Sequence, residues 1–169
     1  MFDPVRICEI LNSEHVDYVI VGGFASVAHG SSLPTQDIDV VPSRHAANLD
    51  RLARALRSMN AMIRTAHEPV PAPIDGLFLA NMPLMLNLVT DFGDIDLTFK
   101  PSGPVGGFDG WNANAIVVEV AEGVTVRIAA LHDIIESKRA ANRPKDLMAL
   151  PYLESLRDEI AARDAEEHT

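Results

Sequence analysis

The order of segments near the start of the chain constrains its fold more than any other feature of the sequence. An apolar run over residues 16–21 predicts a strand, which the glycine pair at 22–23 ends. Residues 24–29 then have the pattern of a short helix, and Gly30 follows as a C-terminal cap. The next predicted strand begins with Asp-Ile-Asp at 37–39. Backbone N–H groups at a glycine turn before a helix can bind an anion, so this order places an anion site near a pair of carboxylates.

Asp37 and Asp39 are two positions apart in the predicted strand, so both side chains leave the same face. Their neighbours Ile38 and Val40 point the other way, into a core. Two carboxylates on one face repel each other unless a cation lies between them, and oxygen ligands of this kind suit Mg²⁺. Two solvated carboxylates at a strand end are the alternative interpretation. The preceding glycine pair favours the metal site, because it lets a triphosphate approach the backbone closely.

The rest of the chain predicts a mixed α/β (α+β) fold. Further helices are predicted over residues 3–11, 45–59, 131–141 and 144–162. Further strands are predicted as two hairpins, 84–89 with 95–99 and 116–120 with 124–128. The proline-rich residues 65–76 and the glycine-rich residues 101–110 are predicted to be loops. We expect a mixed sheet flanked by helices, with residues 1–128 as the core and residues 129–169 as a helical part packed on it.

Charge and cysteine content exclude several classes of protein. The 169 residues include 24 acidic residues against 14 lysines and arginines, a net charge of −10, whereas a protein that coats duplex nucleic acid is normally basic. The single cysteine, Cys8, cannot form an internal disulfide. No uninterrupted apolar stretch of about 18 residues is present, so we expect no membrane span. The first residues lack the pattern of a signal peptide, and we expect a cytoplasmic protein.

Two segments resemble a known enzyme family. Residues 21–30, Val-Gly-Gly-Phe-Ala-Ser-Val-Ala-His-Gly, and residues 35–39, Thr-Gln-Asp-Ile-Asp, are similar to the signature of the DNA polymerase β-type nucleotidyltransferase superfamily. The resemblance is strongest to its small bacterial branch, which includes AbiE-type toxins and related toxin–antitoxin or phage-defence nucleotidyltransferases. It spans residues 16–150 and implies the nucleotidyltransferase fold. Residues 31–34 depart from the family, because they lack the arginine that its members commonly carry there.

The resemblance also implies a third carboxylate on a neighbouring strand. Residues 93–97, Gly-Asp-Ile-Asp-Leu, match the family's Gly-x-x-Asp-Leu element and put Asp96 in that position. Asp94 leaves the same face of the strand and is the competing candidate. The metal ligands and catalytic residues implied in this way are Asp37, Asp39 and Asp96.

The C-terminal helices contain residues that the resemblance assigns to the nucleotide. Lys138 lies on an apolar helical stripe over residues 131–138, so it either extends to solvent or pairs with an anion. A lysine at this place in the family contacts the NTP phosphates. Residues 143–146, Arg-Pro-Lys-Asp, resemble a recurrent family segment and also suit the start of a helix. The residues implied to bind the nucleotide are Gly22, Gly23, Ser26, Lys138, Lys145 and Asp146.

By this resemblance the protein is a magnesium-dependent nucleotidyltransferase that uses two Mg²⁺ ions to move a nucleoside monophosphate from an NTP to an acceptor hydroxyl. Its toxin-like relatives imply an RNA acceptor, such as the end of a tRNA, and a cognate antitoxin as a protein partner. A small hydroxylated antibiotic or a protein is the alternative acceptor, which the acidic charge favours. A noncatalytic module that binds a nucleotide or a partner on the same fold is the remaining alternative.

Overall fold

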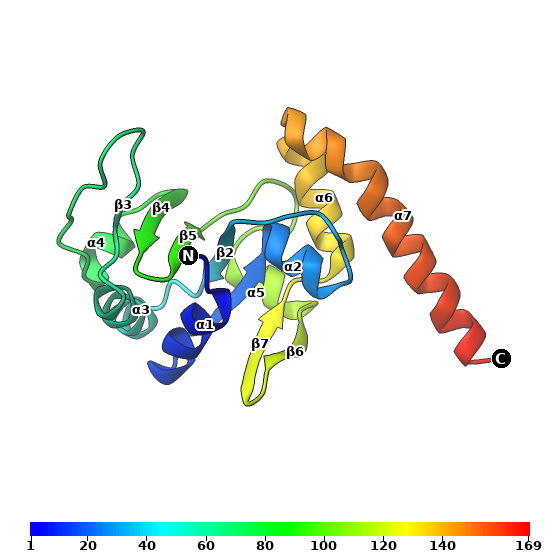
Figure 1. Ribbon diagram of the computed structural model, residues 1–169, viewed down its shortest axis with the longest axis horizontal. Coiled ribbons are helices and arrows are strands. Elements are labelled where there is room, and N and C mark those ends of the chain that lie inside the picture. The colour runs from blue at the N-terminus through cyan, green and yellow to red at the C-terminus, as the bar shows by residue number, and fades with distance from the viewer.

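The computed structural model describes all 169 residues, which form one seven-stranded sheet in the order β3-β4-β5-β2-β1-β7-β6 with helices around it (Figure 1). The strands are β1 (Tyr18–Val21), β2 (Asp37–Pro42), β3 (Met62–Ile63), β4 (Met85–Thr90), β5 (Gly93–Thr98), β6 (Ile116–Ala121) and β7 (Val124–Ile128). The helices are α1 (Pro4–Ser13), α2 (Gly22–Ala28), α3 (Ala46–Ser58), α4 (Gly76–Ala80), α5 (Phe108–Ala113), α6 (Leu131–Ala141) and α7 (Pro144–Glu167). This architecture confirms the predicted mixed α/β fold.

Two parallel strand pairs lie within an otherwise antiparallel sheet. β2 runs parallel to β5, and β1 runs parallel to β7, while β1 with β2, β4 with β5 and β6 with β7 are antiparallel. Both predicted hairpins are therefore present. The β2–β5 pair brings together two acidic strands that are more than fifty residues apart in the sequence, and it determines where the functional site lies.

The main apolar core is a cluster of 31 buried residues from the sheet and from helices such as α1, α3 and α5. On α3 the buried leucines recur every three or four positions, at Leu49, Leu52 and Leu56, which is the spacing of one helix face. A second cluster of five residues joins α6 to α7. Ile134 of α6 belongs to the main cluster, so α6 connects the C-terminal helix pair to the sheet.

Helix α7 has two different halves. Its first half packs on α6 through Leu150, Leu153 and Leu156. From residue 161 onward every side chain is exposed, and this half extends beyond the rest of the molecule (Figure 1). None of the helices combines the length and the apolar character needed to cross a membrane.

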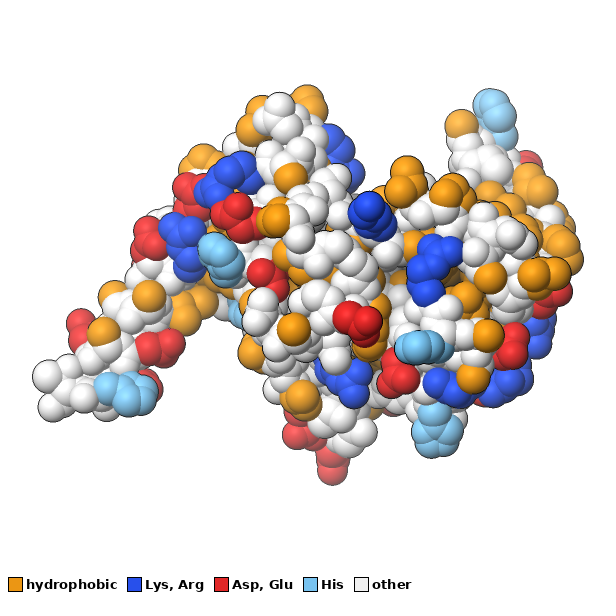
Figure 2. All heavy atoms as spheres, turned by 180° about the vertical axis from the view of Figure 1, so that it is seen from behind, with side chains coloured by type: hydrophobic (Ala, Val, Ile, Leu, Met, Phe, Trp, Pro, Cys, Tyr) orange, Lys and Arg blue, Asp and Glu red, His pale blue; other side chains and the backbone are white.

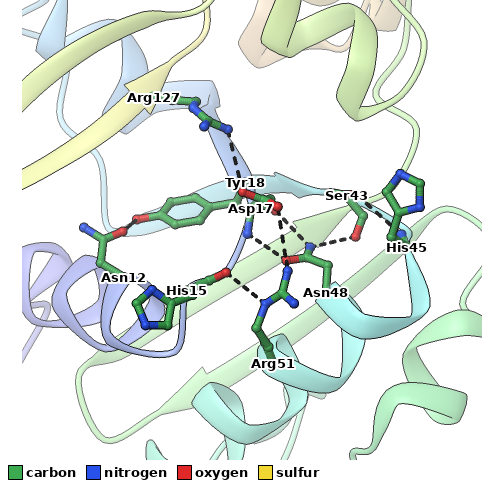
Figure 3. A network of polar contacts seen from close by, with 9 residues as sticks. All are labelled: Asn12, His15, Asp17, Tyr18, Ser43, His45, Asn48, Arg51 and Arg127. Atoms are coloured by element: carbon green, nitrogen blue, oxygen red, sulfur yellow. Dashed lines mark hydrogen bonds and ion pairs between the residues drawn. The ribbon is translucent and has the colours of Figure 1, made fainter.

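A buried asparagine fixes the end of the β1–β2 pair that lies opposite the acidic residues (Figure 3). Asn48 of α3 is 1% exposed, and its side chain accepts a hydrogen bond from the backbone N–H of Asp17 at 2.7 Å. Its amide group donates to the carbonyl oxygens of Asp17 at 3.0 Å and Ser43 at 2.8 Å. Asp17 precedes β1 and Ser43 follows β2, so α3 holds both strands at this end.

Three short elements were not predicted from the sequence. β3 has two residues, too few for a strand period, and it exists because it pairs with β4. α4 begins at an Asp-Gly pair that is typical of a turn, but Asp75 caps a helix by accepting a hydrogen bond from the N–H of Phe78 at 2.7 Å. α5 begins inside the predicted loop over residues 101–110 and buries Trp111.

Candidate active site

A cavity of about 620 Å³ opens where the β1–α2 turn, β2, β5 and the start of α7 meet. Most of the residues predicted for the site line it, namely Gly22, Gly23, Asp37, Asp39, Asp96, Lys138 and Lys145. Asp94, Ser26 and Asp146 are not among its lining residues. The cavity therefore collects the predicted carboxylates and glycines from three separate parts of the chain, and the predicted lysines from α6 and α7.

The carboxylates meet because β2 and β5 pair in parallel and in register. Asp37 lies beside Asp94, and Asp39 lies beside Asp96. Residues paired in this way point to the same face of a sheet, and adjacent strands are about 4.8 Å apart. The side chain of Asp96 lines the cavity and is 11% exposed, whereas the Asp94 side chain is 35% exposed and lies outside the lining. The position of Asp96 fits a third carboxylate of the site better than that of Asp94.

Asp39 is the most perturbed carboxylate of the group. Burial, together with the negative charges of Asp37 and Asp96, raises its pKa to about 7 against the opposing effect of Lys145 and Lys138. A carboxylate with this pKa is held among like charges without enough compensating positive charge. The oxygen donors and the excess of negative charge fit a divalent cation such as Mg²⁺.

Arg64 is a cavity residue that the sequence analysis did not identify. It follows β3, and its guanidinium donates to Asp94 Oδ2 at 2.9 Å and to Asp96 Oδ1 at 2.8 Å. Burial raises the pKa of Asp96, and the charge of Arg64 opposes this effect. No three acidic, histidine or cysteine side chains are placed so that they could hold a metal ion together, and one oxygen of Asp96 is bound by Arg64.

The glycine turn packs directly against Asp39. Gly22 has φ = +69°, and a Cβ at this position would lie 2.3 Å from Asp39 Oδ2. Gly23 faces Thr35, whose Oγ1 would be 2.9 Å from an added Cβ. Ser26 is buried, and its hydroxyl donates to the Gly22 carbonyl at 3.1 Å, so it holds the turn from behind instead of facing the cavity.

Replacing Gly22 with alanine is expected to destabilise the protein and to distort Asp39. The positive φ costs about 1–2 kcal/mol for any residue with a Cβ, and the contact with Asp39 adds to that cost. Urea unfolding measures the loss. Gly123→Ala is the matched control, because Gly123 has φ = +75° and nothing within 4 Å of an added Cβ. Equal losses of stability in the two variants would show that the Asp39 contact is unimportant.

Positive charge lies on the wall formed by α6 and α7. Lys138 of α6 and Arg143 and Lys145 at the start of α7 line the cavity. Arg143 was part of the sequence motif but had not been assigned to the site. These side chains face the carboxylates across the cavity, so the site has an acidic part on the sheet and a basic part on the helices.

Asp146 supports this basic wall from beneath. Its side chain is fully buried, accepts hydrogen bonds from Arg143 Nε at 2.7 Å and from the backbone N–H of Arg143 at 3.2 Å, and lies 3.6 Å from Lys138 Nζ. Burial acts to raise the pKa of Asp146, but the hydrogen bonds and charge of Arg143, together with Lys138, lower it overall. Asp146 therefore does not line the cavity itself; it orients two residues that do.

The loop over residues 31–34 is attached to α7. The hydroxyl groups of Ser32 and Tyr152 share a hydrogen bond at 3.1 Å. The backbone N–H of Ser32 donates to the same Tyr152 oxygen, also at 3.1 Å. The neighbouring Pro34 lines the cavity. The arginines that reach the cavity are Arg64 and Arg143, which come from other elements than this loop.

Solved structures share this fold. The crystal structure of the lincosamide antibiotic adenylyltransferase LnuA with lincomycin bound has a TM-score of 0.59 and 15% sequence identity, covering 89% of this chain and 94% of that chain. The crystal structure of a proposed nucleotidyltransferase from Thermotoga maritima has a TM-score of 0.50 and 14% identity, covering 100% of this chain and 97% of that chain. No protein-family model and no curated protein matches the sequence. The chain therefore has the nucleotidyltransferase fold, recognised through its structure.

Proposed function

We propose that this protein is a magnesium-dependent nucleotidyltransferase, which moves a nucleoside monophosphate from an NTP to a hydroxyl of an acceptor. The observation that carries the proposal is the juxtaposition of Asp37 and Asp39 on β2 with Asp96 on β5, facing one cavity. The glycine turn and the basic wall of α6 and α7 complete the arrangement. The shared fold with an adenylyltransferase supports it.

Each residue has a defined part in this proposal. Asp37, Asp39 and Asp96 would hold the metal. Mg²⁺ in such a site neutralises phosphate charge and stabilises the departing pyrophosphate. The backbone at Gly22 and Gly23 and the basic wall would bind the triphosphate, because N–H groups and cations favour phosphate oxygens.

The transfer itself needs no covalent enzyme intermediate. The acceptor oxygen forms a bond to the α-phosphorus, the bond to the bridging oxygen of the β-phosphate breaks, and pyrophosphate leaves. Asp96 lines the cavity, and one of its carboxylate oxygens would accept the proton of the acceptor hydroxyl. The low exposure of Asp96 keeps this proton transfer away from bulk water.

The acceptor that these observations favour is a small hydroxylated molecule. Asn87 of β4 pairs with Asp96 across the sheet and lines the cavity, and its Oδ1 is buried without a hydrogen-bond partner. A hydroxyl or amine of the acceptor would satisfy this oxygen. Acidic and basic side chains are mixed over the face in Figure 2, with no continuous basic surface of the kind that nucleic acids require. LnuA, with lincomycin bound, provides an example of a small acceptor on this fold.

A transfer assay separates the acceptor classes. The purified protein is incubated with Mg²⁺ and each α-labelled NTP, in parallel with lincomycin and other hydroxylated antibiotics and with total bacterial RNA. Label on a small molecule, lost in the Asp37→Ala/Asp39→Ala double variant, would support the proposal. Label on RNA of tRNA size would support the toxin-like acceptor instead. Binding of Mg²⁺–NTP with no label transferred to any acceptor would favour a noncatalytic nucleotide-binding module.

Replacing Lys138 with glutamine is expected to raise the KM for NTP by about 10- to 100-fold, the effect of losing one charged hydrogen bond to phosphate. The apparent KM for the acceptor is expected to change little, because Lys138 lies on the opposite wall from Asn87 and Arg64. Lys100→Gln is the control, since Lys100 is exposed and does not line the cavity. An unchanged KM for NTP in Lys138→Gln would remove this lysine from the nucleotide site.

A further inference from the structure

We propose that Arg64 is a positioning residue that holds Asp96 in the absence of nucleotide and prevents the carboxylates from binding a divalent cation tightly by themselves. The proposal rests on the function proposed above, in which Asp96 is a metal ligand. It assigns Asp94 a separate part, as the carboxylate that retains Arg64 when Asp96 is released.

The contact geometry is that of one guanidinium between two carboxylates. Arg64 Nη1 donates to Asp94 Oδ2 at 2.9 Å, and Nη2 donates to Asp96 Oδ1 at 2.8 Å. The planar guanidinium presents its donors as a rigid fork, so it can engage both partners at once. The side chains of Arg64 and Asp96 are 29% and 11% exposed, so this contact lies at the cavity wall and not on the open surface.

Arg64 and a divalent cation compete for the same charge. Asp96 faces Asp39, and its charge is one of those that act on Asp39. A guanidinium on Asp96 offsets part of the negative charge that would attract a metal, and it repels a second cation in a partly buried site. Arginine stays protonated under all ordinary conditions, so it cannot vacate the site by losing a proton. It can only move.

Asp94 gives Arg64 a place to remain when Asp96 is released. Asp94 neighbours Asp37 in the sheet but does not line the cavity, and its contact with Arg64 uses a different guanidinium nitrogen. The backbone of Arg64 is held by its N–H, which donates to the Asn87 carbonyl at 3.0 Å. The side chain can therefore shift toward Asp94 while the main chain stays in place.

The consequence is an order of binding. The carboxylates alone, with Arg64 among them, are a weak cation site. The triphosphate brings additional negative charge to the cavity, which offsets Arg64 and makes cation binding favourable. The metal is thus expected to enter with the NTP and not before it.

Manganese binding tests the inference without any turnover. Free Mn²⁺ is titrated by electron paramagnetic resonance in the presence of the whole protein, with no NTP and no acceptor. Arg64→Gln is expected to bind Mn²⁺ about tenfold more tightly than the unsubstituted protein. Arg54→Gln is the matched control, because it makes the same change in charge at a surface ion pair with Glu14 and is expected to leave Mn²⁺ binding unchanged.

A double-mutant comparison with Asp94→Asn separates the proposal from a general charge effect. When Asp94 is replaced, Arg64 has only Asp96 as a partner, so removing Arg64 in this background is expected to increase Mn²⁺ affinity by more than tenfold. A general effect of charge would give the same factor in both backgrounds. Circular dichroism and thermal unfolding of each variant confirm that it is folded.

Three results would overturn the inference. Weaker Mn²⁺ binding by a folded Arg64→Gln would mean that Arg64 orients Asp96 for the metal, and an effect equal to that of Arg54→Gln would mean that the contact with Asp96 is irrelevant. Equal factors in the two Asp94 backgrounds would remove the part assigned to Asp94. Failure of the proposed function looks different: Mn²⁺ binding would then be the same in Asp39→Asn as in the unsubstituted protein.

Discussion

Replacing Asp39 with asparagine is expected to abolish nucleotide transfer and also to stabilise the protein in the absence of metal. The loss of one of the carboxylates proposed to hold the metal is expected to reduce the rate of transfer by about a thousandfold or more, since metal ligation supplies several kcal/mol of transition-state stabilisation. The gain in stability has a separate cause. The carboxylate of Asp39 is buried among like charges, and asparagine has the same shape without the charge.

The sign of the pH dependence follows from the pKa of Asp39. It is about 7 in the folded protein against an ordinary value of 3.8, so between these limits the folded state binds more protons than the unfolded state. The contribution of Asp39 to stability is therefore present in full below about pH 4 and is lost as the pH rises to 7. At pH 8 without metal, Asp39→Asn is expected to exceed the unsubstituted protein in free energy of unfolding by about 2–4 kcal/mol.

Urea unfolding in the presence of EDTA at pH 5 and pH 8 measures this difference. The advantage of Asp39→Asn should be larger at pH 8 than at pH 5, and Mg²⁺ in excess over EDTA, added together with NTP, should reduce it by stabilising the unsubstituted protein more than the variant. Asp158→Asn serves as a control, because that side chain is 71% exposed. An Asp39→Asn variant that is less stable at pH 8, or that still transfers nucleotide, would contradict the assignment of Asp39.

Replacing Arg143 with glutamine is expected to destabilise the protein by about 2–4 kcal/mol. The substitution leaves the Asp146 carboxylate fully buried with Lys138, at 3.6 Å, as its only remaining cation, and an incompletely paired buried charge is costly. The pKa of Asp146 is lowered in the folded protein chiefly through Arg143, against the effect of burial. Its contribution to stability is therefore present above the unfolded pKa and is lost as the pH falls, so the deficit of Arg143→Gln should shrink toward acidic pH.

A second substitution distinguishes this cause from a simple loss of packing. Asp146→Asn removes the buried charge, so in the Arg143→Gln background it is expected to restore part of the stability, although it is expected to be destabilising alone. Arg139→Gln is the control, because Arg139 makes only exposed ion pairs, which contribute little. Guanidinium unfolding of the unsubstituted protein, the two single variants Arg143→Gln and Asp146→Asn, and the double variant gives the coupling energy between the two residues. Purely additive losses would mean that Arg143 does not stabilise the protein through Asp146.

The parts of the site that could be predicted from the sequence are those with a local signature. The glycine pair after an apolar run and the Asp-x-Asp at alternating strand positions indicate a turn and a face without knowledge of the tertiary structure. Asp96 was reached only through the family resemblance, and the register of β2 with β5 supplies the physical reason, since it places Asp96 beside Asp39.

The parts that could not be predicted depend on contacts between distant segments. Arg64 reaches Asp96 because β3 pairs with β4 at the far edge of the sheet, and a two-residue strand leaves no pattern in the sequence. Asn87 lies beside Asp96 for a similar reason. Ser26 and Asp146 were assigned to the nucleotide because they lie in segments that resemble the family, but their side chains are buried and bonded within the protein.

The cavity walls come from widely separated stretches of the chain, and this separation bears on how such a protein can change during evolution. The basic wall is formed within residues 138–145, whereas the opposite wall is formed within residues 64–87, by Arg64, Met85 and Asn87. β2 and β5 contribute the carboxylates of the cavity. Under the function proposed above, substitutions within residues 64–87 would alter which acceptor binds, while the residues proposed to hold the triphosphate stay the same. A protein with its cavity divided in this way would be able to change its acceptor while its proposed catalytic residues stay the same.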